Sequence, residues 1–204
     1  INSDFFTELI DKKDMQKYTS EKNVLLTIAL LKKHGIKKVV VSPGSTNVTF
    51  VASIQHDKWF ELYSCVDERS AAYMACGLAA ESKEPIVINC TGATSSRNYF
   101  PALTESYYRQ LPILAITSTQ DISKIGNMVC QVIDRSCQPK DTIKYSVHIP
   151  TITNYAEEID CVNKINKAIL ELNHHGIGPV HINLTTTYSE DYSIDRLPTV
   201  RKIQ

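Results

Sequence analysis

Two neighbouring carboxyl side chains, Asp67 and Glu68, lie where the sequence predicts the end of a strand and the start of a helix. Alternating residues indicate the strand over 60–66, and small apolar residues at helical spacing indicate the helix over 68–81. Ligands of an open parallel sheet bind at the carboxyl ends of its strands, where a carboxyl group can hold a proton for the ligand. The alternative is a structural role, because Asp67 is a good N-cap and Glu68 complements the helix dipole by about 0.3–1 kcal/mol.

The rest of the chain predicts the sheet that would hold this pair. Segments that are apolar throughout alternate with segments of helical periodicity, a pattern typical of a parallel sheet buried between helices. We therefore expect an α/β fold with an open, doubly wound, six-stranded parallel sheet and helices on both faces. The predicted strands are 37–41, 60–66, 85–90, 112–117, 145–149 and 179–184, and the predicted helices are 21–34, 47–55, 68–81, 98–109 and 156–174.

The chain of 204 residues is long enough for one sizeable domain. Residues 1–18 are mixed and polar and are predicted to be an N-terminal lead-in. Residues 19–187 hold the predicted strands and helices and form the domain. Residues 188–204 are polar, and we expect a C-terminal linker that runs toward another domain.

Composition and charge argue against several classes of partner. Lys+Arg and Asp+Glu both number 22, so the net charge of zero does not suggest a nucleic acid or a membrane surface. No apolar run is long enough to span a bilayer, and no signal peptide is recognised. The six cysteines include no Cys-x-x-Cys pair, so we expect reduced, mostly buried thiols in a cytoplasmic protein and no metal site.

Small or polar residues follow several predicted strands and should meet at one edge of the sheet. Backbone N–H groups in such loops can contact a polar ligand. Neither a G-x-x-x-x-G-K-[ST] sequence nor a G-x-G-x-x-G sequence opens a helix, so binding of a mononucleotide or NAD by the usual motifs is not expected. The loops are 42–45, 67–69, 91–94 and 118–120.

Five short motifs occur in the order and rough spacing found in thiamine diphosphate-dependent enzymes. The stretch from about residue 20 to residue 187 resembles the N-terminal pyrimidine-binding domain of that family. The subgroup that it resembles most is SEPHCHC synthase of the menaquinone pathway. The motifs are Ser42-Pro43-Gly44-Ser45, Val66 through Tyr73, Cys90-Thr91 through Ala102, Gln131 through Asp134 and Gly178 through Leu184.

The resemblance implies that Glu68 is catalytic and binds the cofactor, thiamine diphosphate. In the family, the equivalent glutamate hydrogen-bonds N1′ of the aminopyrimidine and favours its imino tautomer. That role needs a pocket from which water is excluded, because desolvation strengthens the hydrogen bond. The resemblance also implies that Thr94 and Gln131 contact the cofactor, and that Ser42, Gly44, Ser45 and Gln131 face the substrate.

The implied residues have structural alternatives. Gln131 is equally well explained as a loop amide with satisfied hydrogen bonds. The alternative for 42–45 is an ordinary Pro-Gly turn. Asn98 is expected at the start of a helix, and Arg69 in a surface salt bridge. His181 lies in a predicted strand and is expected to be structural.

The chain also departs from the pattern that it resembles. Thr46 stands where the menaquinone-pathway enzymes carry an arginine that grips a substrate carboxylate, which does not favour isochorismate as the acceptor. Residues 92–97 differ from the usual third loop. The Gly-Asp-Gly motif that holds the diphosphate through Mg²⁺ is absent. We therefore expect Mg²⁺ to be held by a separate diphosphate-binding domain, of the same or another chain, in a homodimer or higher oligomer.

The main hypothesis is the pyrimidine-binding domain of a thiamine diphosphate-dependent lyase or transferase that acts on a 2-keto acid by decarboxylation, carboligation or both. As an isolated chain it should be inactive. One alternative is the small subunit of a split decarboxylase of the phosphonopyruvate or sulfopyruvate type. Two others are a non-catalytic assembly module that retains the fold and an unrelated flavodoxin-like regulatory domain.

Overall fold

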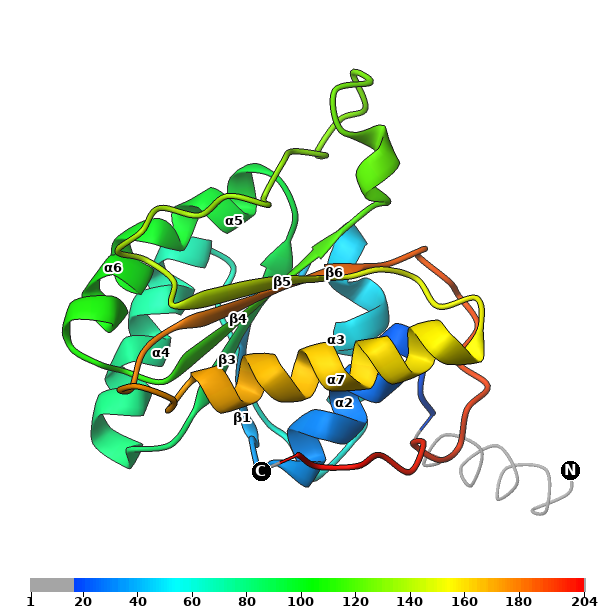
Figure 1. The fold of residues 1–204 in the computed structure, drawn as a ribbon, viewed down its shortest axis with the longest axis horizontal. Helices are drawn as coiled ribbons and strands as arrows, with labels where there is room; N and C mark the ends of the chain where they lie inside the picture. The colour runs from blue at the N-terminus through cyan, green and yellow to red at the C-terminus, as the bar shows by residue number, and fades with distance from the viewer. Residues whose placement is uncertain (1–16, 204) are drawn as a thin grey trace, which may run out of the picture.

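The computed structural model describes residues 17–203 and shows a six-stranded, wholly parallel sheet (Figure 1). Its strand order is β2-β1-β3-β4-β6-β5, so the predicted fold class is confirmed. The central strands are buried on both faces, whereas β2 lies at an exposed edge. The strands are β1 (Lys38–Val41), β2 (Glu61–Ser64), β3 (Ile86–Thr91), β4 (Ile113–Thr119), β5 (Tyr145–Ile149) and β6 (Val180–Thr185).

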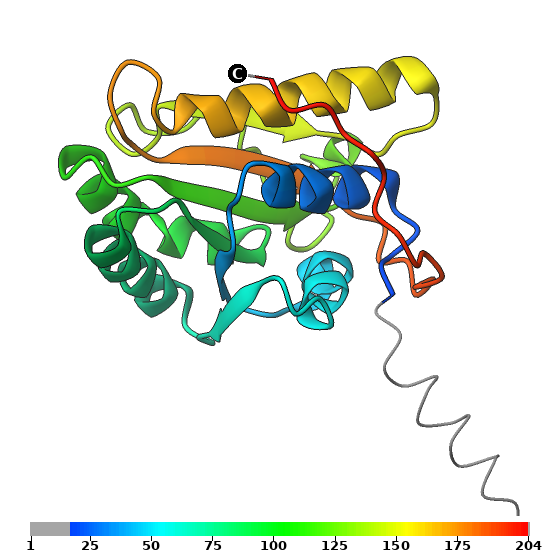
Figure 2. The same cartoon turned by 90° about the horizontal axis from the view of Figure 1, so that it is seen from below.

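Helices cover both faces of the sheet, and each face has its own apolar core (Figure 2). One core lies beneath α2, α3 and α7, and the other lies beneath α4, α5 and α6. Each large side chain that is fully buried in these cores contributes about 1.5–3 kcal/mol. The helices are α2 (Lys22–Lys33), α3 (Val48–Gln55), α4 (Glu68–Ser82), α5 (Thr94–Asn98), α6 (Phe100–Tyr108) and α7 (Tyr155–Glu171), with short 3₁₀ turns η1 (Ser45–Asn47) and η2 (Ile122–Lys124).

The helix predicted over 98–109 is in fact two helices, α5 and α6, joined at Tyr99. Pro101 lies in the first turn of α6 and lacks the N–H that a continuous helix would use to bond the carbonyl of Arg97. The helical segment also begins earlier than predicted, at Thr94. The small residues of the third loop therefore form a helix start rather than an open loop.

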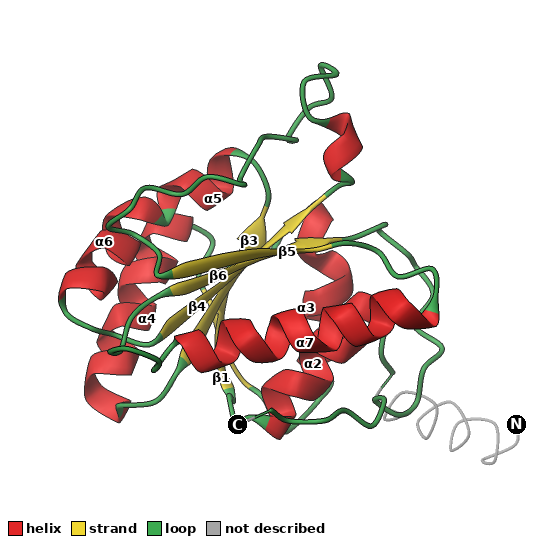
Figure 3. Ribbon diagram, viewed as in Figure 1, coloured by secondary structure: helices red, strands yellow, loops and turns green. Residues whose placement is uncertain are grey.

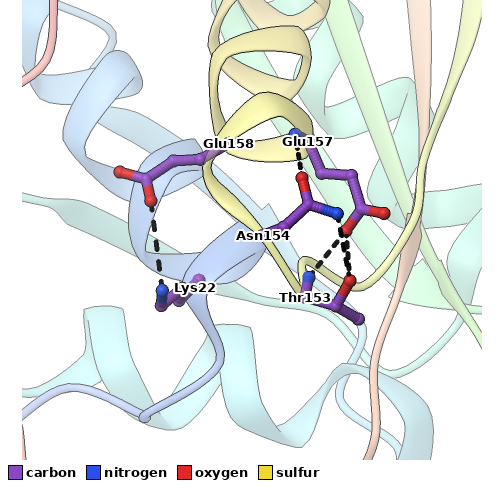
Figure 4. A network of polar contacts seen from close by, with 5 residues as sticks. All are labelled: Lys22, Thr153, Asn154, Glu157 and Glu158. Atoms are coloured by element: carbon purple, nitrogen blue, oxygen red, sulfur yellow. Dashed lines mark hydrogen bonds and ion pairs between the residues drawn. The ribbon is translucent and has the colours of Figure 1, made fainter.

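The turn from β5 into α7 is held by a small polar network (Figure 4). Asn154 caps the helix, because its Oδ1 accepts the backbone N–H of Glu157 at 3.0 Å. Glu157 Oε2 in turn accepts the backbone N–H and the hydroxyl of Thr153 at 2.6 and 2.9 Å, and the backbone bond is the main reason that the pKa of Glu157 is lowered. An ion pair of 4.0 Å between Lys22 and Glu158 joins the starts of α2 and α7.

The C-terminal segment after β6 runs back along α2 (Figures 1 and 2). Ile194 forms an antiparallel bridge with Tyr18, and the carbonyl of Arg201 accepts the Asn166 amide at 2.9 Å. Ile194, Leu197 and Val200 pack against the core beneath α2. The segment assigned as a linker is thus partly packed on the domain, and its role as a connection to another domain stays a prediction.

The structure describes the chain from residue 17 onward. Of the lead-in predicted over 1–18, residues 1–16 lie outside the described residues, and so does residue 204. No helix within residues 17–203 has both the length and the apolar character needed to cross a membrane.

Three of the cysteines, Cys76, Cys90 and Cys161, are buried, and burial raises the pKa of each thiol to about 11 or 12. Cys130 and Cys137 are exposed, contrary to the general expectation of burial.

Candidate functional site

The loops after β1, β2, β3 and β4 all leave the sheet at its carboxyl edge, as predicted. The order of the strands reverses at β1, since β2 lies on one side of it and β3 on the other. In open α/β sheets this reversal is the usual place for a ligand. The first loop (42–45) follows β1, and the third loop (91–94) follows β3, the strand next to β1. α4 begins after β2, the strand on the other side of β1.

Asp67 and Glu68 have different surroundings at the start of α4. Asp67 Oδ2 accepts the backbone N–H of Ser70 at 2.8 Å, so Asp67 is the N-cap. The side chain of Ser70, and then this backbone bond, lower the pKa of Asp67. Glu68 is half-buried, and its Oε2 accepts the side-chain amide of Asn98 at 3.2 Å. No donor within residues 17–203 bonds Oε1 of Glu68. The capping function therefore belongs to Asp67, and Glu68 retains an oxygen for a ligand.

Asn98, which holds Glu68, lies at a different place in its helix than the sequence predicts. The prediction of a helix-start residue is wrong, because Asn98 is the last residue of α5. The early start of α5 at Thr94 brings Asn98 around to Glu68. The break before Pro101 was the one sequence signal that could have suggested this placement.

The first loop is held from inside by Asn47, which is fully buried. Its Oδ1 accepts the N–H of Gly44 at 2.8 Å, and its Nδ2 donates to the carbonyl of Ser42 at 3.1 Å and to Asn89 Oδ1 at 2.7 Å. Ser42 is 2% exposed and donates its hydroxyl to the carbonyl of Cys65 at 2.7 Å. This hydroxyl links the ends of β1 and β2, and the substrate role of Ser42 stays a prediction.

Gly44 and Ser45 lie on the more exposed side of the first loop. Ser45 is exposed and opens η1. Gly44 packs against β3 so closely that a Cβ at this position would lie 2.3 Å from Thr91 Cγ2. The glycine therefore allows the first and third loops to approach each other, and the substrate roles of both residues stay predictions.

Thr46 is interior rather than substrate-facing. It is 1% exposed, its Oγ1 donates to the carbonyl of Ser118 at 3.0 Å, and the same oxygen accepts the N–H of Gly92 at 3.2 Å. The side chain thus ties the first loop to the ends of β3 and β4. A long cation at this position would have to displace that contact.

The third loop contains the most unusual backbone of the site. Ala93 has φ 56° and ψ −132°, a conformation that residues with a side chain rarely adopt and that costs on the order of 1–3 kcal/mol. Strain of this kind is maintained where the surroundings hold the chain, and it often marks ligand sites. Thr94 follows as the first residue of α5 and is exposed, which leaves it accessible to a ligand.

Gln131 lies apart from this cluster. The segment after β4, including η2, projects beyond the carboxyl edge of the sheet as an irregular loop (Figure 3). Gln131 is exposed, has φ 61°, and makes no hydrogen bond within the described residues. The domain alone therefore does not join Gln131 to Glu68, and its role stays a prediction.

The floor of the site is apolar and contains an isolated hydroxyl. Tyr99 is fully buried behind Glu68, next to Cys90 and Ser42, and its OH has no hydrogen-bond partner of suitable geometry. Burial raises the pKa of this phenol well above its ordinary value. Within residues 17–203, no group of three or more His, Cys, Asp or Glu side chains is placed to hold a metal ion.

A doubly wound parallel sheet with a half-buried carboxylate at the carboxyl edge defines a ligand-binding α/β domain. The chain belongs to the family of N-terminal TPP binding domains of thiamine pyrophosphate enzymes, because the model of that family matches residues 24–139.

Relatives and solved structures agree with this assignment. A 2-succinyl-5-enolpyruvyl-6-hydroxy-3-cyclohexene-1-carboxylate synthase from Bacteroides thetaiotaomicron is 38% identical over 187 residues, which cover 91% of this chain and 34% of that protein. The synthase of the same name from Lysinibacillus sphaericus is 33% identical over 85% of this chain and 31% of that protein. The chain thus spans about a third of the length of these curated relatives.

Among solved structures, a thiamine diphosphate-dependent 4-hydroxybenzoylformate decarboxylase from Rhodococcus jostii superimposes with a TM-score of 0.69 at 26% identity, over 85% of this chain and 31% of that chain. The benzoylformate decarboxylase from Polynucleobacter necessarius gives a TM-score of 0.71 at 21% identity, over 92% of this chain and 33% of that chain, which supports the fold alone.

Proposed function

We propose that this domain binds the aminopyrimidine of thiamine diphosphate in an enzyme that acts on a 2-keto acid, as a lyase or a transferase. The observation that carries the proposal is the position of Glu68, which is half-buried beside the reversal point of the sheet with one oxygen unused. When bound, the cofactor supplies the electron sink for 2-keto acid chemistry.

The residues present suit such a heterocycle. Oε1 of Glu68 is available to a ring nitrogen, while the amide of Asn98 holds Oε2 and keeps the carboxyl group in place. In this position Glu68 would bond N1′ of the pyrimidine and hold or release a proton there. The buried ring of Tyr99 and the thiol of Cys90 exclude water from behind the carboxyl group.

The opposite side of the site is open in this domain, and we propose that a second module closes it. That module would be a diphosphate-binding domain of the same or another chain, in a homodimer or higher oligomer, and it would hold Mg²⁺. Thr94 and Gln131 would complete the cofactor contacts, with Ser42, Gly44, Ser45 and Gln131 near the substrate. We also propose a cytoplasmic location, which is consistent with the six free cysteine thiols.

The interior position of Thr46 bears on the acceptor. Threonine carries no charge, so position 46 offers no cation to a substrate carboxylate. Its hydroxyl is also already used in hydrogen bonds within the protein. We therefore do not assign the substrates of the named synthases to this chain. The small subunit of a split 2-keto acid decarboxylase is the second candidate, and the length of the native polypeptide would distinguish the two.

Calorimetric titration with thiamine diphosphate and Mg²⁺ tests the proposal. The full-length or partner-complemented protein should bind the cofactor, and residues 1–204 alone should bind it weakly or not at all. Tight, metal-dependent binding by the isolated domain would contradict the requirement for a second module. No binding by the assembled protein would favour a non-catalytic assembly module.

A further inference from the structure

Gln131 is followed by residues 132–135, a segment that returns from the irregular loop after β4 and packs against α5 (Figure 1). Val132 is 9% exposed and Arg135 is 3% exposed, whereas Gln131 is exposed. The 132–135 segment is thus the point at which the loop is anchored next to Gln131. The position of Gln131 therefore depends on what holds this segment.

Two arginines hold the 132–135 segment on α5, one from each side of the contact. Arg97 of α5 donates from Nη2 to the carbonyl of Asp134 at 3.0 Å. Arg135 of the segment donates from Nη1 to Oγ of Ser96 in α5 at 3.3 Å. A Cβ on Gly92 would lie 2.9 Å from Nη1 of Arg135, so the glycine lets this guanidinium lie against the third loop. Hydrogen bonds with an ionised donor are about twice as strong as neutral ones, so the two bonds suit an anchor.

The guanidinium of Arg97 is oriented by a ring as well as by the carbonyl. Its central carbon lies 5.2 Å from the centre of the Phe100 ring, a distance at which a cation and an aromatic face attract each other. The carboxyl group of Asp134 is engaged elsewhere, because its Oδ1 accepts the backbone N–H of Ser136 at 2.8 Å. Arg97 therefore holds the backbone of the 132–135 segment rather than a side chain that can rotate.

The same short helix also holds Glu68. Asn98 follows Arg97 directly in α5, and its amide donates to Oε2 of Glu68 at 3.2 Å. Arg97 and Asn98 belong to one helical turn, so the backbone fixes their positions relative to each other. One residue of α5 thus holds the carboxyl group of Glu68, and the residue before it holds the 132–135 segment.

We propose that Arg97 is a positioning residue of the cofactor site, which holds the 132–135 segment on α5 and thereby sets the place of Gln131 relative to Glu68. The inference rests on the proposed function, because Gln131 is a cofactor contact only if the domain binds thiamine diphosphate. Arg97 acts through Gln131 and not by a contact of its own with the cofactor. Its removal should therefore weaken cofactor binding no more than the removal of Gln131 does.

The first test measures the anchor without the cofactor, by limited trypsin digestion of the full-length protein. Arg135 is buried, so trypsin should cleave after it only when the segment leaves α5. The initial rate of this cleavage, divided by the rate after the exposed Lys124 of the same loop, should rise about five- to tenfold in Arg97→Met. The matched control is Arg109→Met, which removes an exposed arginine that donates to Glu105 at 3.2 Å and should leave the ratio unchanged.

The second test measures thiamine diphosphate binding by calorimetry, in the assembled full-length protein with Mg²⁺. Arg97→Met should raise the dissociation constant about five- to tenfold, through loss of the contact made by Gln131. Gln131→Ala should raise it by at least the same factor, and Arg97→Met should add nothing in that background. A purely structural effect of Arg97 would instead add to the effect of Gln131→Ala. Arg109→Met should bind the cofactor like the unmodified protein.

Three results would overturn the inference. The first is a cleavage ratio that Arg97→Met leaves unchanged, which would show that Arg97 does not anchor the segment. The second is a dissociation constant that Arg97→Met leaves unchanged or raises equally with and without Gln131. The third is an unmodified assembled protein that does not bind thiamine diphosphate, which would overturn the proposed function as well, while the cleavage ratio still reports on the anchor. If Arg97→Met does not fold, Arg97→Lys, which loses the planar contact with Phe100, decides by the same comparisons.

Discussion

The side-chain amide of Asn98 donates a hydrogen bond of 3.2 Å to Oε2 of Glu68, and this contact joins the end of α5 to the start of α4. The two residues are 30 positions apart in sequence and come from helices that follow different strands. The bond restrains the carboxyl group while leaving Oε1 unused. Glu68 is therefore positioned by the end of α5, and changes in the third loop that precedes α5 should affect it.

The first prediction concerns Glu68→Gln in the assembled protein. The amide retains the shape of the side chain but cannot hold a proton for a ring nitrogen, so turnover should fall by about 10²–10⁴-fold. The melting temperature should stay close to that of the unmodified protein, because the N-cap of α4 is Asp67 and not Glu68. Steady-state kinetics with thiamine diphosphate in excess, together with thermal unfolding, provide the two measurements.

Asp67→Ala is the matched control for that variant and should show the reverse pattern. Loss of the bond to Ser70 removes the N-cap and should lower the free energy of unfolding by about 1 kcal/mol. Turnover of the folded fraction should change far less than in Glu68→Gln. Equal loss of turnover in both variants would indicate that the start of α4, rather than one carboxyl group, is what matters.

The fold was predictable because its signals are local. Apolar runs such as 85–90 identify buried strands directly, and alternation with helices predicts a parallel sheet. The bounds of helices were predicted less well, since the early start at Thr94 depends on Ala93 adopting a conformation that no local propensity favours. Tertiary contacts of the third loop maintain that conformation, and such contacts cannot be read from one segment.

The site was predictable only in part, for the same reason. Glu68 stands at a helix start that the pattern reveals, whereas Asn98 reaches it only through the break before Pro101. Arg135 lies in a polar, irregular stretch of sequence and gave no sign of burial. Arg135 is buried against Gly92 and Ser96, which are far from it in sequence, and such contacts are a property of the folded chain alone.

The second prediction tests the close approach of the first and third loops. Gly44→Ala should lower the free energy of unfolding by about 1–3 kcal/mol, because the new Cβ would lie 2.3 Å from Thr91 Cγ2. In a Thr91→Ser background that methyl group is gone, and the next atom, Thr91 Cβ, lies at an ordinary 3.6 Å. Urea unfolding of the four proteins should therefore give a favourable coupling energy of about 0.5–3 kcal/mol.

Thr91→Ser is a suitable partner because it keeps the hydroxyl that donates to Ser95 at 2.9 Å. The backbone of Gly44 is extended, with φ −169°, so the alanine introduces no conformational strain of its own. If Gly44→Ala costs the same in both backgrounds, the contact with Thr91 is not the reason for the glycine.

The third prediction concerns the interior position of Thr46. Thr46→Val keeps the shape but leaves the Ser118 carbonyl and the Gly92 N–H without their partner, which should cost about 1–3 kcal/mol. Thr46→Ser keeps the hydroxyl and loses one methyl group, so it should cost about 0.8 kcal/mol. Denaturant titration distinguishes the two. A valine variant at least as stable as the serine variant would show that the hydroxyl is dispensable.

The fourth prediction concerns acid sensitivity and depends on His181, which is 4% exposed between β4 and β5. Its Nδ1 faces the hydroxyl of Ser146 at 2.8 Å, and its Nε2 lies 2.7 Å from Thr117 Oγ1. Because Thr117 gives its own proton to Asn183, Nε2 carries the hydrogen and Nδ1 accepts one, which is the neutral tautomer. Burial first, and then Arg135 and Arg97, lower the pKa of His181 to about 3.

Between its ordinary pKa of 6.5 and the folded value of about 3, His181 binds a proton in the unfolded chain but not in the folded one. Stability is therefore lost as the pH falls through this window, by up to about 1.4 kcal/mol for each pH unit from this residue. His181→Gln should be less stable at neutral pH yet show a shallower decline on acidification. Urea unfolding at intervals from about pH 7 to pH 5 measures how steeply the free energy of unfolding falls with pH. The control is His56→Gln, which removes an exposed imidazole.

His34 and His148 also have lowered pKa values and act in the same direction, so part of the decline should remain in His181→Gln. Parallel curves for His181→Gln and the unmodified chain would show that this imidazole is not held neutral in the fold.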